Sequence, residues 1–469
     1  MLFHFKTKSF MFLLAYVAVA TSYYFSGKTT DSEGEELNYD MVSPTDYFLT
    51  LFEQPDSNKA DKAYNYIDQN WKDTYQILLI ETAYFSQNSK NALKLVDLLE
   101  KKTDQNFGLD FDKWFQWYWN KAVDYDEDYY NFKAKLHKRI DSRFEKYFLN
   151  RSEQSKIRLD EVRWGGVLQD GIPPLRNPRM LSSDKANYLR DGATVFGIEV
   201  NGEARAYPKQ ILAWHELFTD TVGGENVAGV YCTLCGTVIL YKSDFKGVKH
   251  QLGTSGFLYR SNKLMYDRAT QSLWSTLEGE PVIGPLVGKG IKLEYLSVVT
   301  TTWGEWKKRH PDTKVLSMQT GHRRDYREGV AYQEYFATDD LMFTVPIIDK
   351  RLNNKDEVLA IRSPKFPEKN LAISSDFLRK NPVYKNQLGD IHFTVFTDDS
   401  GAHRVFKTKE NSFKVYDGQS TTVDDNGITW TIEESKMVSA TDEVFERLET
   451  FNAFWFGYQA AFPDVTLIK

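Results

Sequence analysis

The sequence predicts an α+β multidomain protein with an N-terminal anchor, an α-helical repeat region and a mainly β body built from two similar halves. Three observations lead to this fold class. Apolar residues recur at helical spacing over residues 43–150, short strand-like runs separated by turn residues fill the chain from residue 158 onward, and segments of this β region occur twice. A chain of 469 residues has room for two or three domains.

The N-terminus has the pattern of an export signal. Lys6 and Lys8 precede an uncharged run from Ser9 to Phe25, and Ala18-Val19-Ala20 fits a small-residue cleavage site. A run of about 17 residues is the lower limit for a membrane-spanning helix. We assign residues 1–27 to a signal or membrane anchor and favour an uncleaved anchor over a cleaved, secreted form. In either case the body is expected outside the cytoplasm, periplasmic or extracellular.

Residues 28–42 form a polar linker, and an α-helical region follows at 43–150. Ser43-Pro44 is typical of a helix start, and Asn88-Ser89 predicts a second one. A long helix is expected from about Asp126 to Phe148. Short helices joined by polar turns are similar to HEAT-type helical pairs, and a protein partner is expected on this region. The aromatic run from Trp114 to Trp119 is assigned to the core, with a sugar or peptide platform as the alternative.

The β body is expected to be an internal duplication. The segment 302–316 matches 454–468, with Trp303 aligned to Trp455 and Pro311 to Pro463. Further matches upstream occur in the same order, which favours two related halves at 158–322 and 323–469. The first half contains both cysteines of the chain and the second contains none.

Cys232 and Cys235 lie in the stretch VAGVYCTLCGTVILY, a Cys-Thr-Leu-Cys-Gly turn between two strand-like runs. A strand on both sides argues against the thioredoxin arrangement, in which a helix N-terminus lowers the pKa of the first cysteine. A knuckle between strands can present two thiolates to one metal. The loss of the cysteines from the second half indicates a site-specific role for the pair in the first.

A tetrahedral metal site needs further ligands, and His215 is the best candidate. A structural hydrogen bond is an equally weighted alternative for this histidine. We expect Glu216 or Asp220 to orient its ring, and Asp267 with Arg268 to lie in the supporting shell.

Three interpretations of the cysteine pair stay open. They are a metal site, with zinc or copper favoured over iron, a structural or exchanging disulfide without any cofactor, and inert buried thiols.

The β body contains a series of motifs in a fixed order. They are Gly197–Pro208, Trp214-His215-Glu216, Tyr231–Gly236, Met265–Arg268, Ser272–Trp274 and Thr302–Asp312. Together these motifs resemble the DUF3179 family, a domain of unknown function. The resemblance is strong over about residues 158–362 and weaker beyond, and Thr233 replaces the proline that usually follows the first cysteine. It implies a fold and an extracytoplasmic setting, without a reaction.

Two functions follow as hypotheses. The first is a membrane-anchored extracytoplasmic protein with a metal-binding or thiol-redox site at Cys232, Cys235 and His215. The second is a non-catalytic envelope interaction protein in which the helical region binds a partner and the cysteines form a structural disulfide. A net charge of −6 gives no basic footprint for nucleic acid. No phosphate loop, nucleophile elbow or His-Glu-x-x-His motif occurs, and whether the protein is an enzyme is left open.

Overall fold

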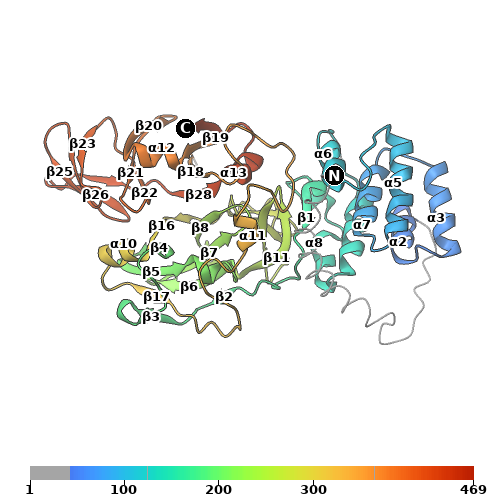
Figure 1. The fold of residues 1–469 in the computed structure, drawn as a ribbon, viewed down its shortest axis with the longest axis horizontal. Helices are drawn as coiled ribbons and strands as arrows, with labels where there is room; N and C mark the ends of the chain where they lie inside the picture. The colour runs from blue at the N-terminus through green and yellow to red at the C-terminus, as the bar shows by residue number, and fades with distance from the viewer. Residues whose placement is uncertain (1–42, 124, 364) are drawn as a thin grey trace, which may run out of the picture.

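The computed structural model describes residues 43–123, 125–363 and 365–469. The predicted anchor at residues 1–27 and the linker at 28–42 lie outside these ranges. Within the ranges, no helix has both the length and the apolar character needed to cross a membrane. Figure 1 shows a helical region at one end of an elongated molecule and two layers of β structure at the other.

The helical region begins where the sequence predicts. Ser43 and Asp46 form a reciprocal capping box at the first helix, and Asn88 caps a later one by accepting hydrogen bonds from the amides of Lys90 and Asn91. The helices lie side by side in Figure 1. They are α2 (Pro44–Glu53), α3 (Asn58–Gln69), α4 (Tyr75–Phe85), α5 (Ser89–Thr103), α6 (Phe111–Trp119) and α7 (Glu127–Lys138).

The aromatic run of α6 is core, as predicted, since Trp114, Phe115, Tyr118 and Trp119 are all buried. The expectation of one long helix to Phe148 is wrong.

Helix α7 ends at Lys138, because Asp141 accepts a hydrogen bond from the amide of Arg143 and binds its guanidinium, which starts a new turn. That carboxylate also accepts the amide of Gln169 at 3.1 Å and so joins the helical region to the β body. The turn continues as η1 (Ser142–Phe144) and α8 (Glu145–Phe148).

The first half contains a hairpin at the predicted Asn-Gly turn, where Asn201 and Gly202 have φ of 48° and 81°. Its sheet has the order β16 (Val299–Thr302), β4 (Thr194–Val200), β5 (Glu203–Pro208), β17 (Lys314–Leu316), β3 (Met180–Ser182). Strand β17 runs parallel to β5 and the other neighbours are antiparallel. The short helix α9 (Lys209–Leu212) follows β5, and α10 (Trp303–Arg309) follows β16.

Two further sheets complete the first half. The second sheet has the order β15 (Tyr295–Leu296), β8 (Thr237–Lys242), β7 (Glu225–Cys232), β6 (Leu217–Val222), β2 (Leu175–Arg176). The third sheet has the order β1 (Val162–Trp164), β11 (Leu252–Tyr259), β12 (Asn262–Asp267), β13 (Leu273–Ser275), β14 (Pro281–Ile283). Short elements between them are η2 (Ser152–Gln154), η3 (Leu159–Glu161), η4 (Ser183–Lys185), β9 (Asp244–Phe245) and β10 (Val248–Lys249).

The second half repeats this plan. The order β28 (Thr450–Phe454), β18 (Glu357–Ser363), β19 (Phe366–Ser374), β29 (Thr466–Ile468) has the same strand directions as β16-β4-β5-β17, with the parallel pair again last. Helices α12 (Ser375–Lys380) and α13 (Trp455–Ala461) take the places of α9 and α10. The meander β20 (Val383–Leu388), β21 (Ile391–Thr397), β22 (His403–Phe406) repeats β6-β7-β8.

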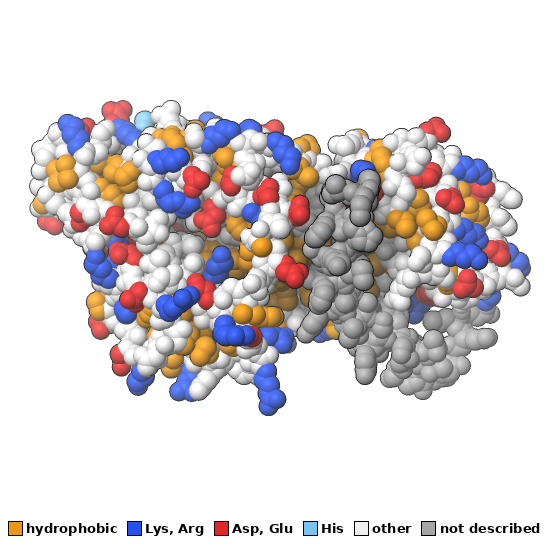
Figure 2. Space-filling model, viewed as in Figure 1, with side chains coloured by type: hydrophobic (Ala, Val, Ile, Leu, Met, Phe, Trp, Pro, Cys, Tyr) orange, Lys and Arg blue, Asp and Glu red, His pale blue; other side chains and the backbone are white. Residues whose placement is uncertain are grey.

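A last antiparallel sheet follows, made of β23 (Phe413–Tyr416), β24 (Thr421–Asp424), β25 (Thr429–Ile432), β26 (Lys436–Ser439) and β27 (Val444–Glu446). The two similar halves predicted from the sequence are therefore present. Acidic and basic side chains are mixed over both the helical and the β parts of the face in Figure 2.

Candidate functional site

The two cysteines close the hairpin turn between β7 and β8, where Cys232 is paired with Thr237. They form a disulfide with a Cα–Cα distance of 5.6 Å. Gly236 completes the turn with φ of 61°, and a Cβ added there would lie 2.8 Å from the ring of Phe454, so both conformation and space require glycine. Cys232 is 2% exposed and Cys235 is fully buried, so the pair has no direct access to solvent.

The second half packs directly on this turn. The amide of Phe454, at the end of β28, donates a hydrogen bond to the carbonyl oxygen of Cys235 at 2.7 Å. Gly457 of α13 lies so close that an added Cβ would be 2.6 Å from the Cβ of Cys235. Asn262 of β12 donates to the carbonyl of Gly457 at 2.8 Å. The cysteine turn is therefore part of the contact between the two halves.

Residues 332–348, here called the cover segment, also pack against the turn. The segment contains α11 (Gln333–Phe336), and its remaining residues have no helix or strand. Tyr335 donates a hydrogen bond to the carbonyl of Leu234, between the cysteines, at 2.6 Å. Val345 is fully buried in the same apolar cluster as Cys232 and Cys235. The cover segment thus keeps the disulfide out of solvent.

A buried charged network adjoins the turn. The hydroxyl of Thr233, between the cysteines, donates to Oε1 of Glu216, and Lys263 of β12 binds Oε2 of the same carboxylate at 2.6 Å. Tyr332 of the cover segment donates to Oε1 at 3.1 Å. Glu216 and Tyr332 both have positive φ, 55° and 58°, a conformation that costs a residue with a side chain about 1 kcal/mol or more. Strained residues of this kind concentrate at functional sites.

Burial sets the electrostatics of this network. It lowers the pKa of Lys263, and the adjacent Glu216 carboxylate opposes that shift. Burial, together with the charge of Glu216, raises the pKa of Tyr231 and Tyr332. Among the described residues, the hydroxyl of Tyr231, next to Cys232, is buried without a hydrogen-bond partner. The surroundings of the disulfide are therefore buried and contain the Glu216–Lys263 ion pair.

His215 is fully buried, but both of its ring nitrogens are bonded away from the cysteines. Nδ1 lies 2.8 Å from the carbonyl oxygen of Pro173, and Nε2 lies 2.6 Å from the hydroxyl of Tyr326. Burial lowers the pKa of His215 to about 4, which keeps the ring neutral. These contacts correspond to the alternative role for His215, a structural hydrogen bond, and not to metal ligation.

Glu216 lies beside the cysteine turn, whereas the other three predicted supporting residues contact other parts of the body or solvent. Asp220 binds the guanidinium of Arg205 and the hydroxyl of Tyr207, Asp267 binds Nδ1 of His250 and Thr270, and Arg268 is exposed. Across the described ranges, no group of three or more His, Cys, Asp and Glu side chains could hold a metal ion. The turn itself offers two sulfur atoms, fewer than the three or four ligands of a zinc site. The metal site therefore stays a prediction, and the described residues supply no third ligand for it.

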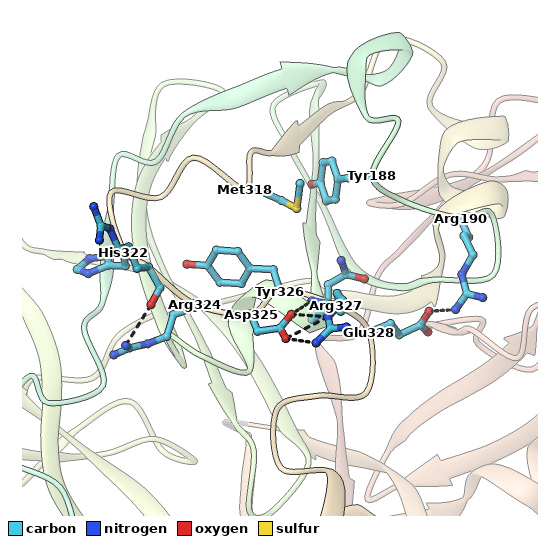
Figure 3. Close-up of a pocket in the computed structure, with 11 residues that line it drawn as sticks. Tyr188, Arg190, Met318, His322, Arg324, Asp325, Tyr326, Arg327 and Glu328 are labelled. Atoms are coloured by element: carbon cyan, nitrogen blue, oxygen red, sulfur yellow. Dashed lines mark hydrogen bonds and ion pairs between the residues drawn. The ribbon is translucent and has the colours of Figure 1, made fainter. Parts of the chain in front are cut away.

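A surface hollow that no sequence pattern predicted lies beyond His215. Tyr326 lines it and joins it to His215, while Arg324 and His322 lie at one end (Figure 3). Asp325 binds Arg327, two positions further along the same exposed loop. The charges around the hollow are therefore partly paired.

Sequence reasoning also missed the residues that surround the turn. Lys263 is a lysine within a strand whose six residues are all buried, NKLMYD, and a charge in such a strand is a usable signal for a buried pair. Tyr332 and Tyr335 lie about a hundred residues further along the chain in an irregular segment, so no local pattern points to them.

Comparisons with known proteins cover the β body. A family model described as a protein of unknown function (DUF3179) matches residues 169–465. No curated protein and no solved structure matches the chain. The helical region lies outside the matched residues.

Proposed function

Because the chain belongs to the DUF3179 family, whose function is unknown, we infer its activity from the site and propose that Cys232 and Cys235 form a reversible thiol–disulfide couple. The pair would alternate between the disulfide and the dithiol while the β body stays folded. This is the redox form of the first hypothesis, and it needs no bound metal.

The observation that carries the proposal is the matching turn in the second half. Thr397 pairs with His403 there as Cys232 pairs with Thr237, and the second turn is one residue longer. Counted from the paired residue of the first strand, Ser400 takes the position of Cys235. Ser400 also contacts the opposite half, through side chains: its hydroxyl lies 2.9 Å from that of Thr301. The turn therefore folds and packs without cysteines, and folding alone does not explain the pair in the first half.

Stability is also a weak reason for such a disulfide. The bridge spans three positions of sequence, and closing so short a loop contributes about 2 kcal/mol, near the low end for disulfides. The buried ion pair and the strained backbone of Glu216 beside the turn cost stability instead. A strained residue and a buried ion pair beside the cysteine pair are features that stability does not select for, and they therefore support a chemical role for the pair.

The exchange can be written as a balanced reaction with an external dithiol. A thiolate of that dithiol attacks one sulfur of the pair and forms a mixed disulfide, while the other cysteine leaves as a thiolate. The second thiol of the reductant then displaces the first cysteine. Two electrons and two protons pass to Cys232 and Cys235, and the reductant becomes a disulfide. Because both cysteines are buried, the cover segment has to move first.

A redox titration of the full chain tests the proposal. The protein is equilibrated in a series of buffers of reduced and oxidised small dithiol, and its thiols are trapped and counted by mass spectrometry. We expect one two-electron transition, with the near-ultraviolet circular dichroism of the folded protein on both sides of it. A pair that is reduced only when the chain unfolds overturns the proposal and favours the structural disulfide of the interaction-protein hypothesis. Zinc or copper that co-purifies and is lost in Cys232→Ser would favour the metal site.

We further propose that the body works outside the cytoplasm, held there by an N-terminal anchor or secreted after cleavage. The export pattern at residues 1–27 supports this setting, and disulfides persist in oxidising compartments. Cell fractionation with a C-terminal tag, combined with N-terminal sequencing, distinguishes anchored, cleaved and cytoplasmic protein.

A further inference from the structure

Helix α6 of the helical region reaches the cover segment. The side-chain amide of Gln116 donates to the hydroxyl of Thr344 at 2.7 Å and to the carbonyl oxygen of Val345 at 3.2 Å. Both acceptors are buried, and Val345 belongs to the apolar cluster that contains the cysteines. One side chain of the helical region therefore fixes a residue that packs in the disulfide cluster.

An aromatic contact reinforces the same junction. The guanidinium of Arg163, on β1, lies 4.1 Å from the ring centre of Phe115 of α6 and 5.8 Å from that of Phe343 of the cover segment. Ser261 donates to the carbonyl of Phe343 at 2.7 Å. Residues 343–345 are thus held between α6 and the first half.

The remaining bonds of the cover segment come mainly from side chains. Tyr332 binds Glu216, Tyr335 binds the carbonyl of Leu234, and Lys355 binds the carbonyl of Thr338 at 2.6 Å. Apart from α11, the described segment has no backbone ladder to hold it. A segment held by a few side-chain bonds opens at a lower free energy than a strand or a helix.

We propose that Gln116 latches the cover segment, so that the helical region controls access to the cysteine pair. The inference rests on the proposed redox function and specifies its regulation. In the latched state the disulfide is protected, and displacement of α6, for example by a protein bound to the helical region, releases residues 343–345 and opens the site. The helical region thereby gains a role as a control element for the redox site.

Disulfide reduction by a water-soluble phosphine measures this access. The phosphine attacks one sulfur, and with one water molecule the products are the phosphine oxide and two thiols, which are alkylated and counted with time. The full chain is compared with Gln116→Ala and Gln116→Glu. Loss of two hydrogen bonds is expected to accelerate reduction about tenfold in Gln116→Ala. Gln116→Glu is expected to be faster still, because its carboxylate faces the carbonyl oxygen of Val345.

Gln76→Ala is the matched control. Gln76 is a buried glutamine of the same region whose bonds, to Asp73 and Lys121, stay within it. Its loss should lower the urea midpoint without changing the reduction rate.

Unchanged reduction in both Gln116 variants, or equal acceleration in Gln76→Ala, overturns the latch. A different result would overturn the redox proposal. In that case the cysteine pair of the unmodified protein would be reduced in the dithiol buffers only when the chain unfolds.

Discussion

The amide of Phe454 donates to the carbonyl oxygen of Cys235 at 2.7 Å, and so the second half of the body holds the cysteine turn of the first. The reciprocal contact joins Thr301 of the first half to Ser400 in the matching turn of the second. Each half thus packs the end of its central sheet on the hairpin turn of the other. The duplication placed the cysteines at a symmetric interface, where their environment is set by residues of both halves.

Gly457→Ala is expected to disturb this interface. An added Cβ would lie 2.6 Å from the Cβ of Cys235, and neither atom is at the end of a flexible side chain. Overpacking of this kind costs about 1–3 kcal/mol, more than the helix propensity gained by alanine. Urea unfolding measures the loss. Gly192→Ala is the control, because no atom of the described residues lies within 4 Å of an added Cβ there. Equal stability of the two variants would contradict the close packing.

Tyr335→Phe is expected to make the disulfide easier to reduce. The substitution removes the hydrogen bond to Leu234 and keeps the ring, so the cover segment loses about 1 kcal/mol of local stability and reduction by phosphine accelerates about fivefold. Tyr295→Phe breaks the same type of bond, to the carbonyl of Leu277, away from the cysteines. Acceleration in both variants would indicate global loosening in place of a local cover.

Glu216→Gln is expected to destabilise the protein by about 3 kcal/mol, because it leaves the Lys263 ammonium buried without its partner. The double variant Glu216→Gln/Lys263→Met removes both charges and should be more stable than the single one. A double-mutant cycle from urea unfolding gives the coupling. Asp61→Asn, which breaks an exposed pair with Lys94, should cost under about 0.5 kcal/mol. Additive effects of Glu216 and Lys263 would refute the ion pair.

Stability is expected to fall in acid because of three buried histidines. Burial lowers the pKa of His137, His215 and His403 from 6.5 to about 3, 4 and 3. Below pH 6.5 the unfolded chain binds protons that the folded chain does not, so the free energy of unfolding decreases as pH falls towards those values. His215 contributes about 3 kcal/mol of this change.

Urea midpoints between pH 7 and 4.5 measure the acid effect. His215→Gln should flatten the decrease, whereas replacement of the exposed His322 should leave it unchanged. A pH-independent midpoint would show that these imidazoles titrate normally.

Patterns local in sequence predicted local structure. The Asn201-Gly202 turn, the Ser43 and Asn88 caps and the repeated halves all depend on residues close together or on direct repetition, and all are present. The long helix to Phe148 failed because Asp141, a side chain within the periodic run, satisfies the backbone of the next turn.

The site depends on contacts that no local pattern contains. His215 is bonded to residues 42 and 111 positions away, and Glu216 to a lysine 47 positions away. The cysteine turn could be identified from its sequence. The cover segment and the charged side chains beside the turn could not. Adjacent residues, His215 and Glu216, consequently serve different networks.

Arg309→Met is expected to weaken the contact between the halves. Arg309 ends α10 in the first half and binds Glu434 at 3.2 Å and the carbonyl oxygens of Gln419 and Ile432 at 2.6 and 2.9 Å in the second. Its removal deletes three partly buried hydrogen bonds, while Glu434 keeps Arg404 as a partner, so we expect a loss of about 2–4 kcal/mol.

Lys307→Met on the same helix removes an exposed pair with Asp191 and a cation–π contact with Trp303, and it should cost under about 0.5 kcal/mol. In calorimetry, Arg309→Met should broaden or split the transition of the β body, because its two halves then unfold with less coupling. A transition as sharp and as stable as that of Lys307→Met would show that Arg309 does not join the halves.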